Sequence, residues 1–196
     1  MEFAKGKDLS FKMNNLVEKA RDLFFRYGTK RVSVEEICQE AGVSKMTFYR
    51  YFPNKNALTK YIVETIYNEA KDRVNDILAM DIPFEERLKK VLMTKMEFAD
   101  KYSREFLSEL TMGTEPEIKQ YVEEENTKFL NDLRKVFQDA QRNGEIRLDI
   151  KIDFILYMMN IMRNVFNDEN LQKLYPDFAS FMKEAFNFFY YGVLKR

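Results

Sequence analysis

Apolar residues recur at spacings of three and four along nearly the whole chain, and this periodicity restricts the fold more than any other feature of the sequence. Such spacing places apolar side chains on one face of a helix. Only 6 glycines and 4 prolines interrupt the 196 residues, and we find no alternating run typical of a strand. The sequence therefore predicts an all-α protein of about nine helices.

Helix start and stop signals organise the first part of the chain. Gly28 follows an amphipathic stretch, at the position of a left-handed C-terminal cap. Ser33 and Glu36 form a capping-box pattern that begins a second, short helix. Gly42 then breaks this helix and allows a tight turn over residues 41–44.

A third and very short helix follows directly. Ser44 is placed to cap it, and Pro53 stops it after Tyr51. Asn54 can cap a fourth helix that runs to about residue 80. We therefore expect a three-helix N-terminal domain over residues 1–56 and a larger helical domain over residues 57–196.

The remaining signals predict five more helices. One is expected over residues 84–102, and a shorter one over residues 106–112. Thr114 and Glu117 form a second capping-box pattern for a long helix that ends at Asn143 and Gly144. Asp149 is expected to cap the next helix, and Pro176 to lie in the first turn of the last.

The second helix, the turn and the third helix together have the spacing of a helix-turn-helix. In that motif the second member lies in the major groove of DNA and presents its N-terminal residues to base edges. Spacing alone leaves an ordinary helical corner as an alternative. The charge distribution gives weak support for DNA, since residues 1–60 carry 12 Lys and Arg against 7 Asp and Glu in a chain with no net charge.

The third helix has a surface suited to DNA. Phe48 and Phe52 are four residues apart and are expected to pack inward. The side chains left on or near the outer surface are Lys45, Met46, Thr47, Tyr49, Arg50 and Tyr51. Phenol hydroxyls beside cations suit contacts with phosphate and sugar. These residues, together with the capping Ser44, form the predicted DNA-binding surface.

The N-terminal part of the sequence resembles a known family. The segment RVSVEEICQEAGVSKMTFYRYFPNKNAL, with LVEKARDLFFRYG before it, is similar to the N-terminal signature of TetR-family regulators. The close resemblance covers roughly residues 12–60, while the length, the number of helices and the segment NGEIRLDIKIDFIL fit the family layout less specifically. The resemblance implies a dimeric DNA-binding transcriptional repressor with a ligand-sensing helical body.

The resemblance also implies roles for single residues. Ser33 is expected to cap the second helix and touch a phosphate, and residues 45–47 to face base edges. Tyr49, Tyr51 and Lys55 are expected to hold the DNA backbone. The matching positions thus combine base reading with backbone contacts.

Several of these positions leave alternatives open. Met46 stands where the family usually has Gly or Ala, so its thioether either contacts a thymine methyl or covers the groove edge. Arg50 is at a variable position and could meet a phosphate or a guanine. There are simpler structural interpretations: Ser33 only caps its helix, Lys55 is only a solvated cation, and Tyr49 only packs against its neighbours.

A reading helix this short requires two copies, about 34–36 Å apart on a palindromic site. The resemblance implies a homodimer whose interface is a bundle of four helices, two from each chain. The residues predicted at this interface are Phe154, Met158, Met162, Val165, Phe181, Met182, Ala185, Phe186 and Phe189. The alternative is that these side chains form an intrachain core.

The larger domain is rich in Phe, Tyr and Met, which line adaptable apolar cavities. We predict a pocket for a hydrophobic or aromatic effector that releases the repressor from its operator. Its predicted lining is Met93, Met96, Phe98, Tyr102, Phe106, Met112, Phe129, Leu133 and Phe137. Because such residues more often fill a core, the alternative is a DNA-binding regulator or architectural protein with no small-molecule ligand.

The residues that usually perform catalysis are scarce. The chain has no histidine, one cysteine and no glycine-rich phosphate loop, so we expect no enzymatic activity, no metal site and no cofactor. Cys38 cannot form an internal disulfide, and we see neither a signal peptide nor a membrane span. We therefore expect a cytoplasmic protein.

Overall fold

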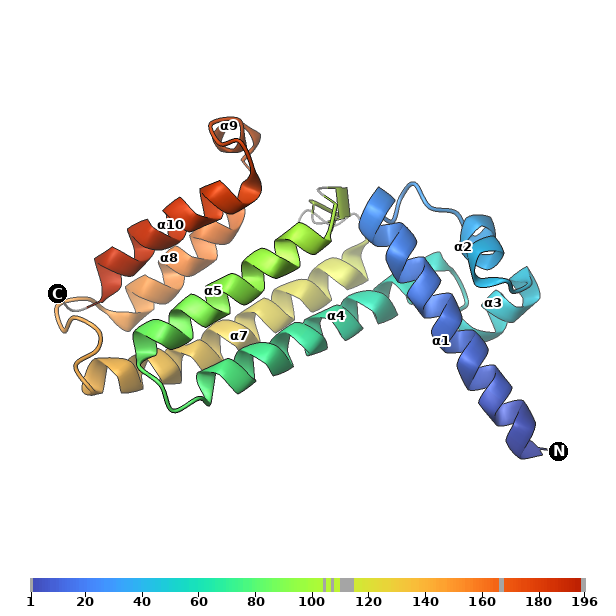
Figure 1. Cartoon of the computed structure of the whole chain (residues 1–196), viewed down its shortest axis with the longest axis horizontal. Helices are drawn as coiled ribbons and strands as arrows, with labels where there is room; N and C mark the ends of the chain where they lie inside the picture. The colour runs from blue at the N-terminus through green and yellow to red at the C-terminus, as the bar shows by residue number, and fades with distance from the viewer. Residues whose placement is uncertain (1, 104, 107, 110–114, 166–167, 195–196) are drawn as a thin grey trace. The chain divides into compact units, whose positions relative to one another are not determined.

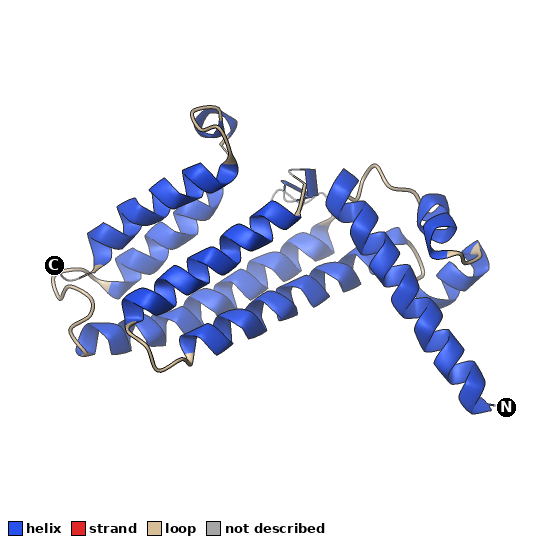
Figure 2. Ribbon diagram, in the orientation of Figure 1, coloured by secondary structure: helices blue, strands red, loops and turns tan. Residues whose placement is uncertain are grey.

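A computed structural model of the chain describes residues 2–103, 105–106, 108–109, 115–165 and 168–194. The regular structure in these residues is helical, which confirms the all-α prediction (Figure 1, Figure 2). The helices are α1 (Glu2–Tyr27), α2 (Val34–Ala41), α3 (Lys45–Tyr51), α4 (Lys55–Leu78), α5 (Phe84–Lys101), α7 (Pro116–Arg142), α8 (Ile152–Val165), α9 (Glu169–Gln172) and α10 (Phe178–Val193). Of the helices described, none has the length and apolar character needed to cross a membrane.

The chain divides into two compact units. The first unit comprises Met1–Glu69 and Lys101–Val122, and the second comprises Ala70–Asp100 and Glu123–Arg196. Helices α4 and α7 each contribute residues to both units. This grouping describes compactness, whereas the boundary predicted after residue 56 concerns the roles of the two parts and stays a prediction.

The local signals of the first unit are confirmed. Gly28 and Gly42 have φ angles of 78° and 63°, in the left-handed region where a side chain costs energy. The N–H of Gly28 donates to the carbonyl of Phe24 at 2.9 Å and closes the end of α1. At the start of α4, the Oδ1 atom of Asn54 accepts a hydrogen bond from the N–H of Ala57 at 2.8 Å.

Helices α1 and α4 each bury one apolar face in the first unit. The fully buried residues with helical spacing on these faces are Leu16, Ala20, Phe24, Leu58, Ile62 and Ile66. At the edge, the guanidinium of Arg21 donates to both carboxylate oxygens of Glu69, at 2.8 and 2.7 Å. This bidentate pair joins α1 to α4 and raises the pKa of Arg21.

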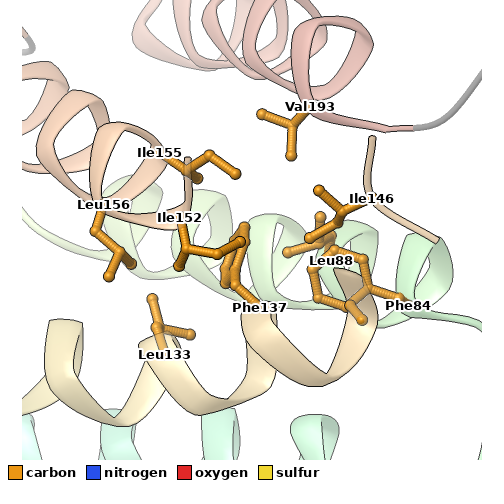
Figure 3. Packing of buried hydrophobic residues seen from close by; sticks show 10 residues of the cluster. Phe84, Leu88, Leu133, Phe137, Ile146, Ile152, Ile155, Leu156 and Val193 are labelled. Carbon is orange, nitrogen blue, oxygen red and sulfur yellow. The ribbon is translucent and has the colours of Figure 1, made fainter. Parts of the chain in front are cut away.

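The second unit contains a larger apolar cluster, to which α5, α7, α8 and α10 contribute (Figure 3). The rings of Phe84 and Phe137 pack edge to face, with centroids 5.2 Å apart. The buried members are Phe84, Leu88, Leu133, Phe137, Ala140, Ile146, Ile152, Ile155, Leu156 and Val193. A smaller cluster of Val74, Ile77 and Val91 joins α4 to α5.

Polar contacts close the ends of the helices around this cluster. The carboxylate of Glu145 accepts a hydrogen bond from the N–H of Phe84 at 2.8 Å, which satisfies a donor at the start of α5. The side-chain amide of Gln141 donates to the carbonyls of Arg147 and Ile150, at 2.9 Å each. The segment between α7 and α8 is thereby held against the end of α7.

Two predictions about the later helices are wrong. Helix α8 begins at Ile152, and the carboxylate of Asp149 accepts hydrogen bonds from the guanidinium of Arg147 instead of capping the helix. Pro176 precedes the last long helix, whose N-terminal cap is Asp177, bonded to the N–H of Ser180 at 2.6 Å. Asp149 thus binds the neighbouring cation Arg147, and Asp177 provides the cap next to Pro176.

Some predictions fall on residues that the structure does not describe. Thr114, the expected cap of the long helix, lies outside the described residues, and so does Met112. In the segment predicted as a sixth helix, the described residues 106, 108 and 109 are helical.

The core of the second unit leads to a stability prediction. Phe137→Ala should lower the free energy of unfolding by about 3–5 kcal/mol, because Phe137 is fully buried and its loss leaves a cavity. Leu148→Ala, at a side chain that is 80 % exposed, should change it by less than about 0.5 kcal/mol. Urea unfolding followed by circular dichroism measures both values. Similar losses in the two variants would contradict the assignment of this core.

Candidate nucleic-acid interface

Helix α2, the first helix of the candidate interface, is capped by Ser33 and Glu36, which bond to each other's backbone N–H groups. The Oγ atom of Ser33 accepts from the N–H of Glu36 at 3.2 Å, and the carboxylate of Glu36 accepts from the N–H of Ser33 at 2.7 Å. These contacts confirm the predicted capping box. The bond from the backbone of Ser33 lowers the pKa of Glu36, since it favours the charged carboxylate.

The turn after α2 has the geometry that glycine allows. The N–H groups of Gly42 and Val43 donate to the carbonyls of Gln39 and Cys38, at 3.2 and 3.0 Å. The Nδ2 atom of Asn15 on α1 donates to the carbonyl of Ala41 at 2.8 Å. The last carbonyls of α2 are therefore bonded both within the turn and to α1.

Ser44 caps the start of helix α3, as predicted. Its Oγ atom accepts from the N–H of Thr47 at 3.2 Å and lies 3.0 Å from the Oγ1 atom of Thr47. Both side chains belong to the predicted DNA-binding surface. In the free protein the hydroxyl of Ser44 caps α3 and is hydrogen-bonded to that of Thr47, and each hydroxyl still has a lone pair or proton to offer a ligand.

Two phenylalanines hold α3 in place. Phe48 is fully buried and Phe52 nearly so, with ring centroids 6.2 Å apart, as the spacing predicted. Phe52 also packs against Tyr61 of α4, at 5.7 Å between centroids. Tyr49 packs edge to face against Phe48 at 5.2 Å, although its own side chain is exposed. Burial on one side therefore leaves the opposite side of α3 open.

The open side of α3 presents the residues that the sequence predicted. Met46 is 85 % exposed, and Lys45, Tyr49 and Arg50 are exposed as well. Thr47 and Tyr51 are half-buried. The helix therefore offers an ammonium, a thioether, hydroxyls and a guanidinium within seven residues. That combination matches the donors and apolar groups that read base edges and phosphates.

An ion pair not foreseen from the sequence lies at the start of α3. The ammonium of Lys45 donates to the carboxylate of Glu35 on α2. This hydrogen bond raises the pKa of Lys45 and lowers that of Glu35, because each charge stabilises the other. Both groups are exposed, so a phosphate can compete for the ammonium.

Lys55 has a structural function in the free protein. Its Nζ atom donates to the carbonyls of Thr29 and Val32, at 2.8 Å each. An ammonium has three N–H donors, so these bonds use two of them. The predicted contact of Lys55 with the DNA backbone stays a prediction, while the alternative of a merely solvated cation does not describe these contacts.

Two cations in the loop before α2 were not predicted from the sequence as DNA contacts. Lys30 and Arg31 are exposed in the loop that ends at Ser33. The guanidinium of Arg31 lies 5.6 Å from the ring centre of Tyr27, which orients it. Basic residues directly before a capping serine were the signal that could have added them to the candidate phosphate contacts.

Comparison with known proteins agrees with this geometry. Residues 16–62 match the family described as bacterial regulatory proteins, tetR family. This match ends within α4 and includes α2, the turn and α3. This segment belongs to the TetR family, so the chain has the N-terminal helix-turn-helix of a DNA-binding transcriptional regulator.

Relatives and solved structures extend the likeness beyond this segment. The chain is 23 % identical over 135 residues to the uncharacterized HTH-type transcriptional regulator YhgD of Bacillus subtilis, covering 67 % of this chain and 70 % of that protein. The structure of a TetR-family regulator from Cytophaga hutchinsonii has a TM-score of 0.74 at 14 % identity, over 93 % and 94 % of the two chains. The transcriptional regulator FadR from B. subtilis, in complex with stearoyl-CoA, has a TM-score of 0.70 at 16 % identity, over 90 % and 97 %. These structures share the fold with this chain.

The predicted pocket residues occupy different surroundings in this protein. Leu133 and Phe137 belong to the apolar cluster of the second unit, and Phe129 packs against it. Tyr102 and Phe106 lie in the first unit against Phe25. Met93 is exposed, Met112 is outside the described residues, and so are the side chains of Met96 and Phe98. A ligand-lining role for this set stays a prediction.

The predicted interface residues on α8 and α10 also differ from one another in burial. Phe181 is buried in its own chain and packs against Tyr175, at 5.1 Å between centroids. Met158, Ala185, Phe186 and Phe189 are half-buried, and Phe154 is exposed. The side chains of Met162, Val165 and Met182 lie outside the described residues. Their role at an interface between chains stays a prediction.

Three exposed aromatic residues on the same helices were not predicted. Tyr157 of α8 lies three residues after Phe154, and Phe188 and Tyr191 of α10 are likewise three apart. Phe188 is 80 % exposed, an unusual state for so large an apolar side chain. Aromatic residues on the helix side away from the core were the signal for them.

The pair between Lys45 and Glu35 leads to a binding prediction. Glu35→Gln should raise the affinity for a duplex about three- to tenfold and steepen the slope of log affinity against log salt by about 0.9, because the freed ammonium can meet one more phosphate. Glu40→Gln removes the same charge from the same helix and should leave the slope unchanged. Fluorescence anisotropy at several salt concentrations measures both slopes. Equal slopes in the two variants would show that the pair does not restrain Lys45.

Proposed function

We propose that this protein is a TetR-family repressor that binds a palindromic operator as a homodimer and leaves it when a hydrophobic or aromatic small molecule binds. The observation on which the proposal rests is the presentation of α3. Its apolar side is buried through Phe48, while Lys45, Met46 and Tyr49 project from the other side. A repressor needs such an exposed, rigidly held helix to enter the major groove.

We assign different contacts to different residues of this surface. Residues 45–47 at the start of α3 are proposed to face base edges, because the N-terminal end of the reading helix enters the groove first. Tyr49, Tyr51 and Lys55 are proposed to contact the DNA backbone, with Ser33 at a phosphate. Arg50 and Ser44 complete the proposed surface.

We propose that residues 1–56 contact DNA, while residues 57–196 provide dimerisation and sensing. The exposed aromatic residues of α8 and α10 support dimerisation, because a second copy would remove them from water. Two copies bound to successive half-sites need reading helices about 34–36 Å apart. A twofold pair meets that need on a palindrome.

The sensing part of the proposal is supported by a structural likeness and by the apolar residues of the second unit. The FadR structure, similar in fold, contains stearoyl-CoA, a ligand with a long apolar chain. The second unit of this chain is rich in aromatic and aliphatic residues near α7, among them Phe129, Leu133 and Phe137. A regulator or architectural protein with no small-molecule ligand is the competing function.

Dimerisation can be tested at the exposed aromatic residues. Phe188→Lys combined with Tyr191→Lys should shift the protein from dimer to monomer at micromolar concentration, since charge would enter an apolar interface. Leu148→Lys, at another exposed apolar residue, should leave the dimer intact. Sedimentation velocity measures the oligomeric state. A dimer unchanged by the double substitution would contradict the proposed interface.

Sensing can be tested with ligands on DNA-bound protein. The probe is a duplex that the wild-type protein selects from a random-sequence pool. Stearoyl-CoA and a set of aromatic compounds are titrated against the complex, and an effector should weaken DNA binding about 5- to 150-fold. Only a ligand that prefers the DNA-free conformation can do so. If none of these compounds changes DNA affinity, the ligand-free alternative is favoured.

A further inference from the structure

A carboxylate from a distant part of the chain binds the loop before α2. Glu109 belongs to the first unit, and its side chain accepts three hydrogen bonds from this loop. The donors are the N–H and the Oγ1 hydroxyl of Thr29, both at 2.6 Å, and the N–H of Lys30, at 3.3 Å. Hydrogen bonds to a charged acceptor are stronger than those between neutral groups.

A cation binds the backbone carbonyl groups of the same loop. Lys55, the first residue of α4, donates to the carbonyls of Thr29 and Val32. The amides of the loop thus meet a negative charge while its carbonyls meet a positive one. Together, Glu109 and Lys55 satisfy backbone groups that have no partner in a helix here.

Gly28 permits the approach of Glu109. Its φ of +78° favours glycine, and a Cβ atom built on it would lie 3.0 Å from the Oε1 atom of Glu109 and 3.2 Å from the Cβ atom of Glu105. A side chain at this position would therefore press against the segment that contains both glutamates. The glycine serves the turn and the contact at once.

The segment that contains Glu109 has further contacts with the end of α1. Phe25 packs against Tyr102 and Phe106, with centroids 4.2 and 5.1 Å away. The N–H of Ser103 donates to the carbonyl of Phe25 at 2.8 Å. Because these contacts do not involve Glu109, the segment should stay attached when that carboxylate is removed.

We infer that Glu109 is a positioning residue for DNA binding: its hydrogen bonds to Thr29 and Lys30 fix the loop that presents Lys30, Arg31 and Ser33 to the DNA backbone. The exposed cations and the capping serine lie within four residues of the bonded amides. A loop without this anchor must lose more conformational entropy when it meets phosphates. The DNA-reading part of the chain thus depends on a residue far beyond its first sixty. The inference rests on the proposed DNA contacts of the loop.

Binding measurements on the full chain test the inference. Glu109→Ala should weaken binding to the selected duplex about tenfold, as expected when hydrogen bonds to a charged group are lost. Glu109→Gln should recover part of this loss, because its amide oxygen can still accept from the N–H of Thr29. Glu105→Ala, which removes the same charge from the same segment and keeps its Cβ atom, should stay within about twofold.

The direction of the effect separates positioning from charge. Removing a negative charge near DNA should strengthen binding by electrostatics alone. A loss in Glu109→Ala therefore indicates a displaced loop, whereas unchanged or tighter binding overturns the inference. Thr29→Val, which removes the hydroxyl donor alone, should give a smaller loss and serves if the alanine variant fails to fold.

Amide hydrogen exchange gives a readout that needs no DNA. In the free wild-type protein the amides of Thr29 and Lys30 should exchange slowly, and in Glu109→Ala they should exchange at least about tenfold faster, with the amides of α1 unchanged. Equal exchange in both proteins overturns the inference. If the wild type binds no duplex at all, the proposed function fails, while the exchange data still decide whether Glu109 holds the loop.

Discussion

Everything in the proposed DNA contact depends on the burial of Phe48 and Phe52. Helix α3 has seven residues, too few to be stable through its own hydrogen bonds. Two buried rings on one side, together with the Ser44 cap, supply what propensity lacks. Because Phe48 and Phe52 face inward, the outer side is free to present polar groups together with the thioether of Met46. Stability and recognition therefore use opposite sides of the same two turns.

Two cations of this surface already have polar partners before DNA binds. Lys45 pairs with Glu35, and Lys55 binds two loop carbonyls. Exposed ion pairs contribute little to stability, so the cost of exchanging Glu35 for a phosphate is small. The pair still lowers the net charge that nonspecific DNA meets. Such a restraint weakens attraction to any duplex and leaves discrimination to base contacts, which suits a regulator that must find one site among many.

Local rules account well for what the sequence predicted. Ser33, Gly42 and Ser44 act through neighbours three or four residues away, so their caps and turn could be inferred from the sequence alone. Asp149 shows the limit, because Arg147 competes for the same carboxylate and either partner satisfies the local pattern. The contact of Glu109 with Thr29 spans 80 residues, and no periodicity specifies it. Tyr157, Phe188 and Tyr191 were missed because the predicted interface residues were chosen from apolar positions at helical spacing, and many of those positions also face the core.

The position of Glu109 has a consequence for how the protein can be divided. The segment 1–60 resembles a self-contained DNA-binding domain, yet a chain of that size buries too little surface to be more than marginally stable. Here residues 101–122 join it in one compact unit, through the contacts of Phe25 and Glu109. The compact unit that contains the proposed DNA-binding surface is therefore completed by residues that follow α5 in the sequence. Any conformational change that moves this segment must alter the loop before α2, whether a ligand, a partner or DNA itself causes it.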